Sequence, residues 1–131
     1  MMSSDFEVTA SAGSLRPASH VGVEFPHRWT DDGVVVEAAF TGAHLLHLSI
    51  ACCVLNDIYR EAEPLGVVVA GVRVSARGDF DRETWRSTGV EYEVEIISDS
   101  NAGDVAELLR VVDDVAEIPR ALRAEATVSR V

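Results

Sequence analysis

The sequence predicts one α+β domain in which an antiparallel sheet wraps around a long central helix. Two observations carry this prediction: a nearly unbroken apolar segment with helical character follows Thr41, and two long segments of alternating apolar and polar residues come after it. The chain has 131 residues, 47% of them hydrophobic, and shows no linker, repeat or low-complexity segment. Residues 1–131 are therefore expected to form a single domain with the element order βββ-α-ββ-α-β.

Three short strands are expected in the first forty residues. Residues 6–10 and 21–25 are rich in strand-forming side chains, and a turn region containing Gly, Ser and Pro separates them. The tight-turn signal Asp31-Asp32-Gly33 then precedes a third strand at residues 34–40. This spacing predicts a three-stranded meander.

The long helix is expected to begin at Thr41-Gly42. Its apolar side chains cover almost the whole circumference as far as Leu55, which indicates a central helix rather than one lying on the surface. We expect the helix to end near Ala62, because Pro64 and Gly66 follow.

Two long antiparallel strands are predicted after the helix, at residues 67–76 and 89–97. In the second, apolar side chains alternate with Glu91, Glu93 and Glu95, so one face of the pair is expected to be solvated.

The remainder of the chain is predicted to add one helix and one strand. Ser100 or Asn101 is suited to cap a helix at residues 102–117, which has an apolar stripe. Pro119 is expected to end that helix, and residues 124–131 are predicted to form the last strand.

Charge and composition exclude several classes of function. The 22 acidic residues face 11 basic residues, all of them Arg, and the net charge of −11 repels phosphate backbones and anionic lipids. No nucleic-acid or membrane partner is therefore expected. The absence of Lys excludes Schiff-base chemistry. The apolar runs are too short to cross a bilayer, and the first residues lack a signal-peptide pattern. A soluble cytoplasmic protein is expected.

The two cysteines of the chain are adjacent in the long helix. Neighbouring helical positions point about 100° apart, so Cys52 and Cys53 are unsuited to an ordinary disulfide and are expected to be free thiols. Cys53 shares its helical face with Asn56, Asp57 and Arg60. The Arg would favour a thiolate and the Asp would oppose it, so the sign of the effect stays open. A buried thiol that merely packs in the core is the alternative.

Other polar groups on the helix are weaker candidates. His44 and His47 lie one turn apart and are suited to bind a metal, but they are more simply read as polar residues satisfied at a helix start or a dimer interface. Asp57, Arg60 and Glu61 have the spacing of ion pairs at an exposed helix end. We expect neither a metal nor a cofactor.

The residues around Cys53 match a known pattern. We match Leu45, Ala51, Cys53 and Gly66 to a helix pattern of Leu, Ala and Cys that is followed by a Gly at the start of a long strand, and residues 118–122 (IPRAL) to a later segment that begins with Cys-Pro. Together with the element order, these motifs resemble the OsmC/Ohr family, the osmotically induced and organic hydroperoxide resistance proteins. The resemblance implies an intertwined homodimer with pockets at the subunit interface and places Cys53 at the peroxidatic position.

The chain departs from that family at functional positions. Ile118 stands where the family has its second, resolving cysteine, and Ala43 stands where it has a glutamate that pairs with an active-site arginine. For that arginine, Arg16 is the preferred match and Arg28 the second choice.

Two functions are compatible with this pattern. The first is a one-cysteine thiol-dependent peroxidase in oxidative stress defence, in which Cys53 attacks a small hydroperoxide, Arg16 or Arg60 activates the thiol, and an external thiol reduces the sulfenic acid. The alternative is a non-catalytic protein of the same fold that binds a small hydrophobic ligand at the dimer interface.

Overall fold

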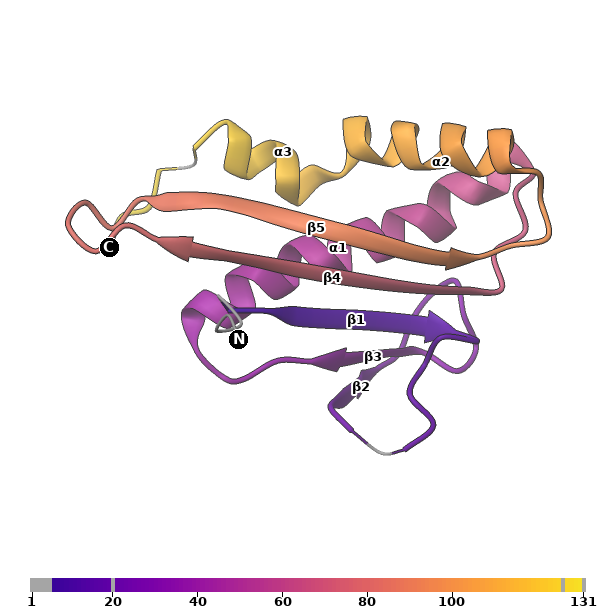
Figure 1. The fold of residues 1–131 in the computed structure, drawn as a ribbon, viewed down its shortest axis with the longest axis horizontal. Helices are drawn as coiled ribbons and strands as arrows, with labels where there is room; N and C mark the ends of the chain where they lie inside the picture. The colour runs from indigo at the N-terminus through magenta and orange to yellow at the C-terminus, as the bar shows by residue number, and fades with distance from the viewer. Residues whose placement is uncertain (1–5, 20, 126, 131) are drawn as a thin grey trace.

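The computed structural model describes residues 6–19, 21–125 and 127–130. It contains a five-stranded antiparallel sheet, one long helix and two shorter helices (Figure 1). The elements in chain order are β1 (Val8–Gly13), β2 (Val23–Phe25), β3 (Val34–Glu37), α1 (Gly42–Leu65), β4 (Gly71–Phe80), β5 (Ser87–Ile97), α2 (Ala102–Val115) and α3 (Glu117–Arg123).

The strand order in the sheet is β2-β3-β1-β4-β5. The predicted meander is wrong, because β1 pairs with β3 and β4 and has no register with β2. Both edges of β1 are occupied, one by β3 and the other by β4, a strand that follows the long helix. A local sequence pattern does not encode such a long-range contact.

Capping signals define α1. The Thr41 hydroxyl accepts a hydrogen bond from the His44 N–H at 3.0 Å, and Gly66 ends the helix in the left-handed conformation with a φ of 69°. The helix continues past the predicted end at Ala62 and contains Pro64 in its last turn, because a proline there removes only one intrahelical hydrogen bond. In the described part of the chain, no helix is long and apolar enough to cross a membrane.

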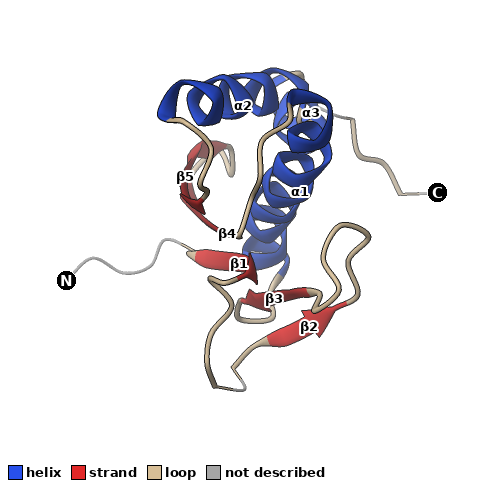
Figure 2. Cartoon of the chain, turned by 90° about the vertical axis from the view of Figure 1, so that its right-hand side faces the viewer, coloured by secondary structure: helices blue, strands red, loops and turns tan. Residues whose placement is uncertain are grey.

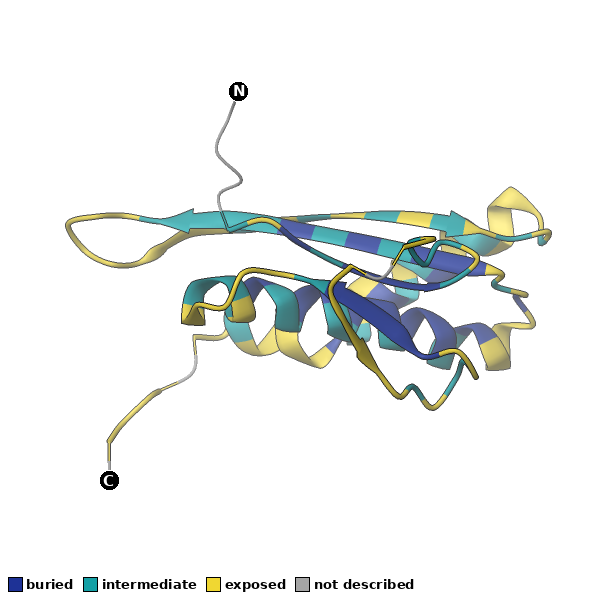
Figure 3. Cartoon of the chain, turned by 90° about the horizontal axis from the view of Figure 1, so that it is seen from below, coloured by how far each residue is buried: buried dark blue, intermediate teal, exposed yellow. Residues whose placement is uncertain are grey.

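The hydrophobic core lies between α1 and the sheet. In Figures 1 and 2, α1 runs along one face of the strands, and α2 and α3 lie beside the edge formed by β5. Figure 3 shows buried positions along the strands of the sheet and along α1. The fully buried side chains include Val8, Val54, Leu55, Ile58, Val72, Val74 and Leu108.

The opposite face of β4 and β5 is solvated, as predicted. Glu91, Glu93 and Glu95 are exposed. Arg73 pairs with Glu95 at 3.0 Å, and Arg77 pairs with Glu93. Because these pairs are exposed, they contribute little to stability and mainly keep this face of the sheet polar.

The C-terminal part differs from the prediction. Asn101 caps α2, accepting a hydrogen bond from the Asp104 N–H at 2.8 Å. The helix ends at Val115, and Pro119 lies inside the first turn of α3, where its missing N–H costs no intrahelical bond. The described residues between 124 and 130 form no strand, so the predicted last strand is wrong; Val128 is 93% exposed, with no sheet partner for its side chain.

Candidate functional site

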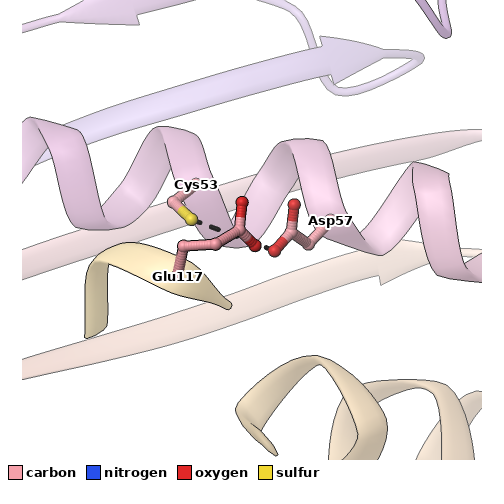
Figure 4. Close-up of side chains that lie close together, drawn as sticks. All are labelled: Cys53, Asp57 and Glu117. Atoms are coloured by element: carbon pink, nitrogen blue, oxygen red, sulfur yellow. Dashed lines mark hydrogen bonds between the residues drawn. The ribbon is translucent and has the colours of Figure 1, made fainter. Parts of the chain in front are cut away.

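The Cys53 thiol faces two carboxylates. Its S–H donates a long hydrogen bond to Asp57 Oδ2 at 3.9 Å, one turn further along α1. Glu117 is the first residue of α3, and its carboxylate lies beside Cys53 and Asp57. The Cys53 Sγ and one carboxylate oxygen each of Asp57 and Glu117 lie within 4.8 Å of one another (Figure 4). Cys53 is half-buried, Asp57 is buried and Glu117 is exposed, so the sulfur lies at the boundary between core and solvent.

Arg60 holds the two carboxylates together. Its guanidinium lies 3.2 Å from Asp57 Oδ2 and 3.4 Å from Glu117 Oε1, and its Nε donates to Glu61 at 3.0 Å. The guanidinium therefore reaches the oxygen that accepts the thiol proton rather than the sulfur. We call Cys53, Asp57, Arg60 and Glu117 the thiol–carboxylate cluster.

The electrostatics of the cluster favour the protonated thiol. Burial raises the pKa of Cys53, and the charges of Asp57 and Glu117 raise it further; hydrogen bonds from the backbone N–H groups of Ile118 and Glu117 act in the opposite direction but do not offset this. The sequence left the direction of the pKa shift open; in the structure burial, rather than a balance of Arg and Asp, is the largest cause of the raised pKa of Cys53.

Asp57 and Glu117 differ in their tendency to bind a proton. Burial raises the pKa of Asp57, and its hydrogen bond with Glu117 raises it further. The same hydrogen bond is the main reason that the pKa of Glu117 is lowered. At the pair, Asp57 is therefore the carboxylate that takes up the proton.

The structure brings together the two positions that the sequence analysis matched to the two family cysteines. The backbone N–H of Ile118 acts to lower the pKa of the Cys53 thiol, which places residue 118 near the sulfur. Its aliphatic side chain provides no second sulfur at this place.

The predicted arginine partners lie elsewhere. Arg16, between β1 and β2, pairs with Glu24 at 3.0 Å and with Asp32 at 4.0 Å. The Arg28 guanidinium lies 5.2 Å from the ring centre of Trp29. Within the described residues, no hydrogen bond or ion pair joins either arginine to Cys53, and Arg60 is the guanidinium of the cluster.

Cys52 lines a separate cavity of about 400 Å³ between α1 and the β2–β3 region. Burial raises the pKa of the Cys52 thiol to about 11. The walls are mainly apolar and include Phe25, Val34, Val36, Leu45, Leu48 and Leu55, with His27, Ser49 and Asn56 as polar lining groups.

A chain of hydrogen bonds connects this cavity to the cluster. Asn56 Nδ2 donates to Asp57 Oδ1 at 3.3 Å, Asn56 Oδ1 lies 3.2 Å from His27 Nε2, and His27 Nδ1 lies 2.8 Å from the Thr30 hydroxyl. Sequence reasoning found Asn56 and Asp57 but missed His27, Thr30 and Glu117. These three residues are distant in sequence from Cys53, and no local motif marks them.

His44 and His47 do not point to a common metal site. His44 Nδ1 bonds to the Thr41 hydroxyl at 2.7 Å, whereas His47 Nδ1 bonds to the Ala43 carbonyl at 2.7 Å. The His47 ring is fully buried and lies 6.0 Å from the ring of Phe80. The pair therefore takes part in packing and capping at the start of α1.

The fold and the site together define a class of protein: an α+β domain whose central helix presents a half-buried thiol beside a short C-terminal helix. The sequence model described as OsmC-like protein matches residues 33–130, and the chain therefore belongs to the OsmC-like protein family. A search of curated proteins gives no significant match.

Solved structures have the same fold. The OsmC-like protein from Mycoplasma pneumoniae superposes with a TM-score of 0.61 at 13% identity, covering 72% of this chain and 75% of that one. An OsmC-like hydroperoxide resistance protein from Jannaschia sp. CCS1 superposes with a TM-score of 0.53 at 15% identity, covering 95% and 89%. At these identities the similarity concerns the fold alone.

Proposed function

We propose that this OsmC-like protein is a one-cysteine, thiol-dependent peroxidase that reduces organic hydroperoxides in oxidative stress defence, with Cys53 as the nucleophile. The observation that carries the proposal is the half-buried Cys53 sulfur, which has a hydrogen-bond acceptor in Asp57 and backbone N–H donors at residues 117 and 118. Such a thiol has both a proton acceptor and groups that stabilise negative charge on sulfur. The hydroperoxide resistance protein of the same fold supports this choice of substrate.

The proposed cycle needs an external thiol. With Ile118 beside Cys53 in place of a second sulfur, the sulfenic acid formed on Cys53 is reduced by a dithiol from solution. We further propose that the protein works as an intertwined homodimer in the cytoplasm and that Arg16 helps to bind the peroxide. Arg16 Nε is buried without a hydrogen-bond partner among the described residues, so this N–H is an unpaired donor beneath the surface.

The test is consumption of cumene hydroperoxide in the presence of dithiothreitol. Wild type and Cys52→Ser are expected to turn over, and Cys53→Ser is expected to show only the background rate. Equal rates for wild type and Cys53→Ser would exclude the peroxidase function.

A second candidate is the binding of a small hydrophobic ligand without catalysis. Two observations favour it: the pKa of Cys53 is raised, chiefly by burial, and the apolar cavity at Cys52 has a volume of about 400 Å³. Leu48→Trp should fill the cavity and abolish the fluorescence enhancement of a naphthyl dye, whereas Leu65→Trp, at an exposed position outside it, should not. Equal dye binding by both variants would place the dye elsewhere.

A further inference from the structure

We propose that Asp57 is a catalytic residue: its carboxylate takes the proton of the Cys53 thiol and delivers it to the alkoxide that leaves the peroxide. This inference rests on the peroxidase function proposed above and assigns the acid–base group of that reaction.

The position of Asp57 fits this role. Its Oδ2 lies 3.9 Å from the sulfur, and only 1% of the residue is exposed, so the carboxylate itself is shielded from water. Both oxygens are fixed: Asn56 Nδ2 donates to Oδ1 at 3.3 Å, and Arg60 lies 3.2 Å from Oδ2. The carboxylate thus has a fixed orientation next to the reacting atom, at the long end of hydrogen-bond distance for sulfur, as general bases often are before the substrate binds.

The charge balance favours transfer within the cluster over loss of the proton to solvent. The groups that face Asp57 are Arg60 on the same helix and Glu117 on α3, while Glu61 pairs with the far side of Arg60. Two carboxylates thus face one guanidinium. Ionising Cys53 into water would add a further negative charge, whereas moving its proton to Asp57 leaves the total charge unchanged.

Asp57 is also tuned for proton uptake. Burial and the hydrogen bond with Glu117 raise the pKa of its carboxyl, which makes Asp57 a stronger base than an ordinary carboxylate. Beyond Asn56, burial lowers the pKa of His27, so at neutral pH this imidazole adds no positive charge to the network.

The proposed steps balance. Asp57 accepts the thiol proton, and the Cys53 thiolate attacks the terminal oxygen of the hydroperoxide. An S–O bond forms and the O–O bond breaks, so sulfur is oxidised to the sulfenic acid and the peroxide is reduced. The leaving alkoxide takes the proton from Asp57 and departs as the alcohol. An external dithiol then reduces the sulfenic acid, giving water, a disulfide of the reductant and the Cys53 thiol.

The experiment compares two reactions of the same thiol in a Cys52→Ser background. Cumene hydroperoxide releases an alkoxide that needs a proton, whereas iodoacetamide releases iodide, which needs none. Asp57→Asn should lower the peroxide rate constant at pH 7 by about 100-fold. It should change the alkylation rate constant far less, because the iodide leaving group needs no proton and removal of the negative charge next to the sulfur offsets the loss of the proton acceptor.

The ratio of the two rate constants is the decisive quantity. A fall of at least about tenfold supports the acid–base role. If both rate constants change by the same factor, Asp57 affects only the reactivity of the thiol and the inference is overturned. If wild type and Cys53→Ser consume peroxide equally, the peroxidase proposal fails first and the role of Asp57 fails with it.

A second variant covers the case in which Asp57→Asn does not fold. Glu117 is exposed and raises the pKa of Asp57, so Glu117→Gln should move the acid limb of the peroxide pH–rate profile to lower pH. Glu63→Gln, exposed on the same helix as Asp57, is the matched control and should leave the limb in place. An unchanged acid limb in Glu117→Gln would refute the proposed role, because the protonation of Asp57 would then not set the acid limb of the reaction.

Discussion

Raising the pH should destabilise the fold through the buried thiol of Cys52. Burial raises the pKa of this thiol from 9.0 to about 11. The unfolded chain therefore releases the proton near pH 9, whereas the folded chain retains it until about pH 11. In this window the folded state binds more protons, so its stability falls as the pH rises.

The size of the effect follows from the two pKa values. At pH 10.5 most unfolded chains carry the thiolate and most folded chains carry the thiol, which corresponds to a loss of about 2 kcal/mol relative to pH 8. The free energy of unfolding should be measured with urea at both pH values for wild type and Cys52→Ala. The substitution removes this group, so the variant should lose about 2 kcal/mol less than wild type between pH 8 and pH 10.5.

Taking differences between the two pH values cancels the packing lost in Cys52→Ala and the titration of groups that both proteins contain. Equal losses for both proteins would show that the Cys52 thiol is not buried as the structure describes. The same burial predicts an iodoacetamide rate for Cys52 in Cys53→Ser at pH 7 about 100-fold below that of a free cysteine.

Three further substitutions test the fold by thermal and urea unfolding. Gly78→Ala should cost about 1–3 kcal/mol, because a Cβ there would lie 2.4 Å from the Gly89 carbonyl oxygen and 2.7 Å from His47 Nε2, which are both held in place. Asn101→Ala should cost about 1 kcal/mol through loss of the α2 cap. Leu108→Ala should cost about 2–5 kcal/mol, because this fully buried side chain joins α2 to the core.

Matched controls make these outcomes decisive. Gly42→Ala adds a methyl group with no atom within 4 Å and should change stability by less than about 1 kcal/mol. Asn101→Asp keeps a side-chain acceptor and should retain most of the cap. If Gly78→Ala were as stable as Gly42→Ala, the close packing of His47 against β4 would be wrong.

Local signals in the sequence predicted the local parts of the fold. Thr41, Gly66 and Asn101 act as the expected caps, because capping depends on residues within one helical turn. The sheet order was not predictable in this way. It depends on contacts such as Ala10 with Val74, between strands separated by the whole of α1.

In the candidate site too, the residues within one helix were predictable and the distant residue was not. Helical spacing correctly grouped Cys53 with Asp57 and Arg60 on one face of α1. Glu117 was not predictable, because it reaches the thiol only after the chain turns at Ala116 and starts α3. The sign of the effect on the thiol pKa depended on this missing carboxylate and on burial, so composition alone could not give it.

The two adjacent cysteines of α1 lie in two different environments. A label on the sulfur of residue 52 would report on the apolar cavity beside β3. A label on residue 53 would report on the carboxylates beside α3. Inserting one residue upstream in the helix would rotate both sulfurs by about 100°, so the sulfur of residue 52 would move to the former place of the sulfur of residue 53, which would itself leave the carboxylates. The helical phase at these two positions is consequently under tighter constraint than their chemical similarity suggests.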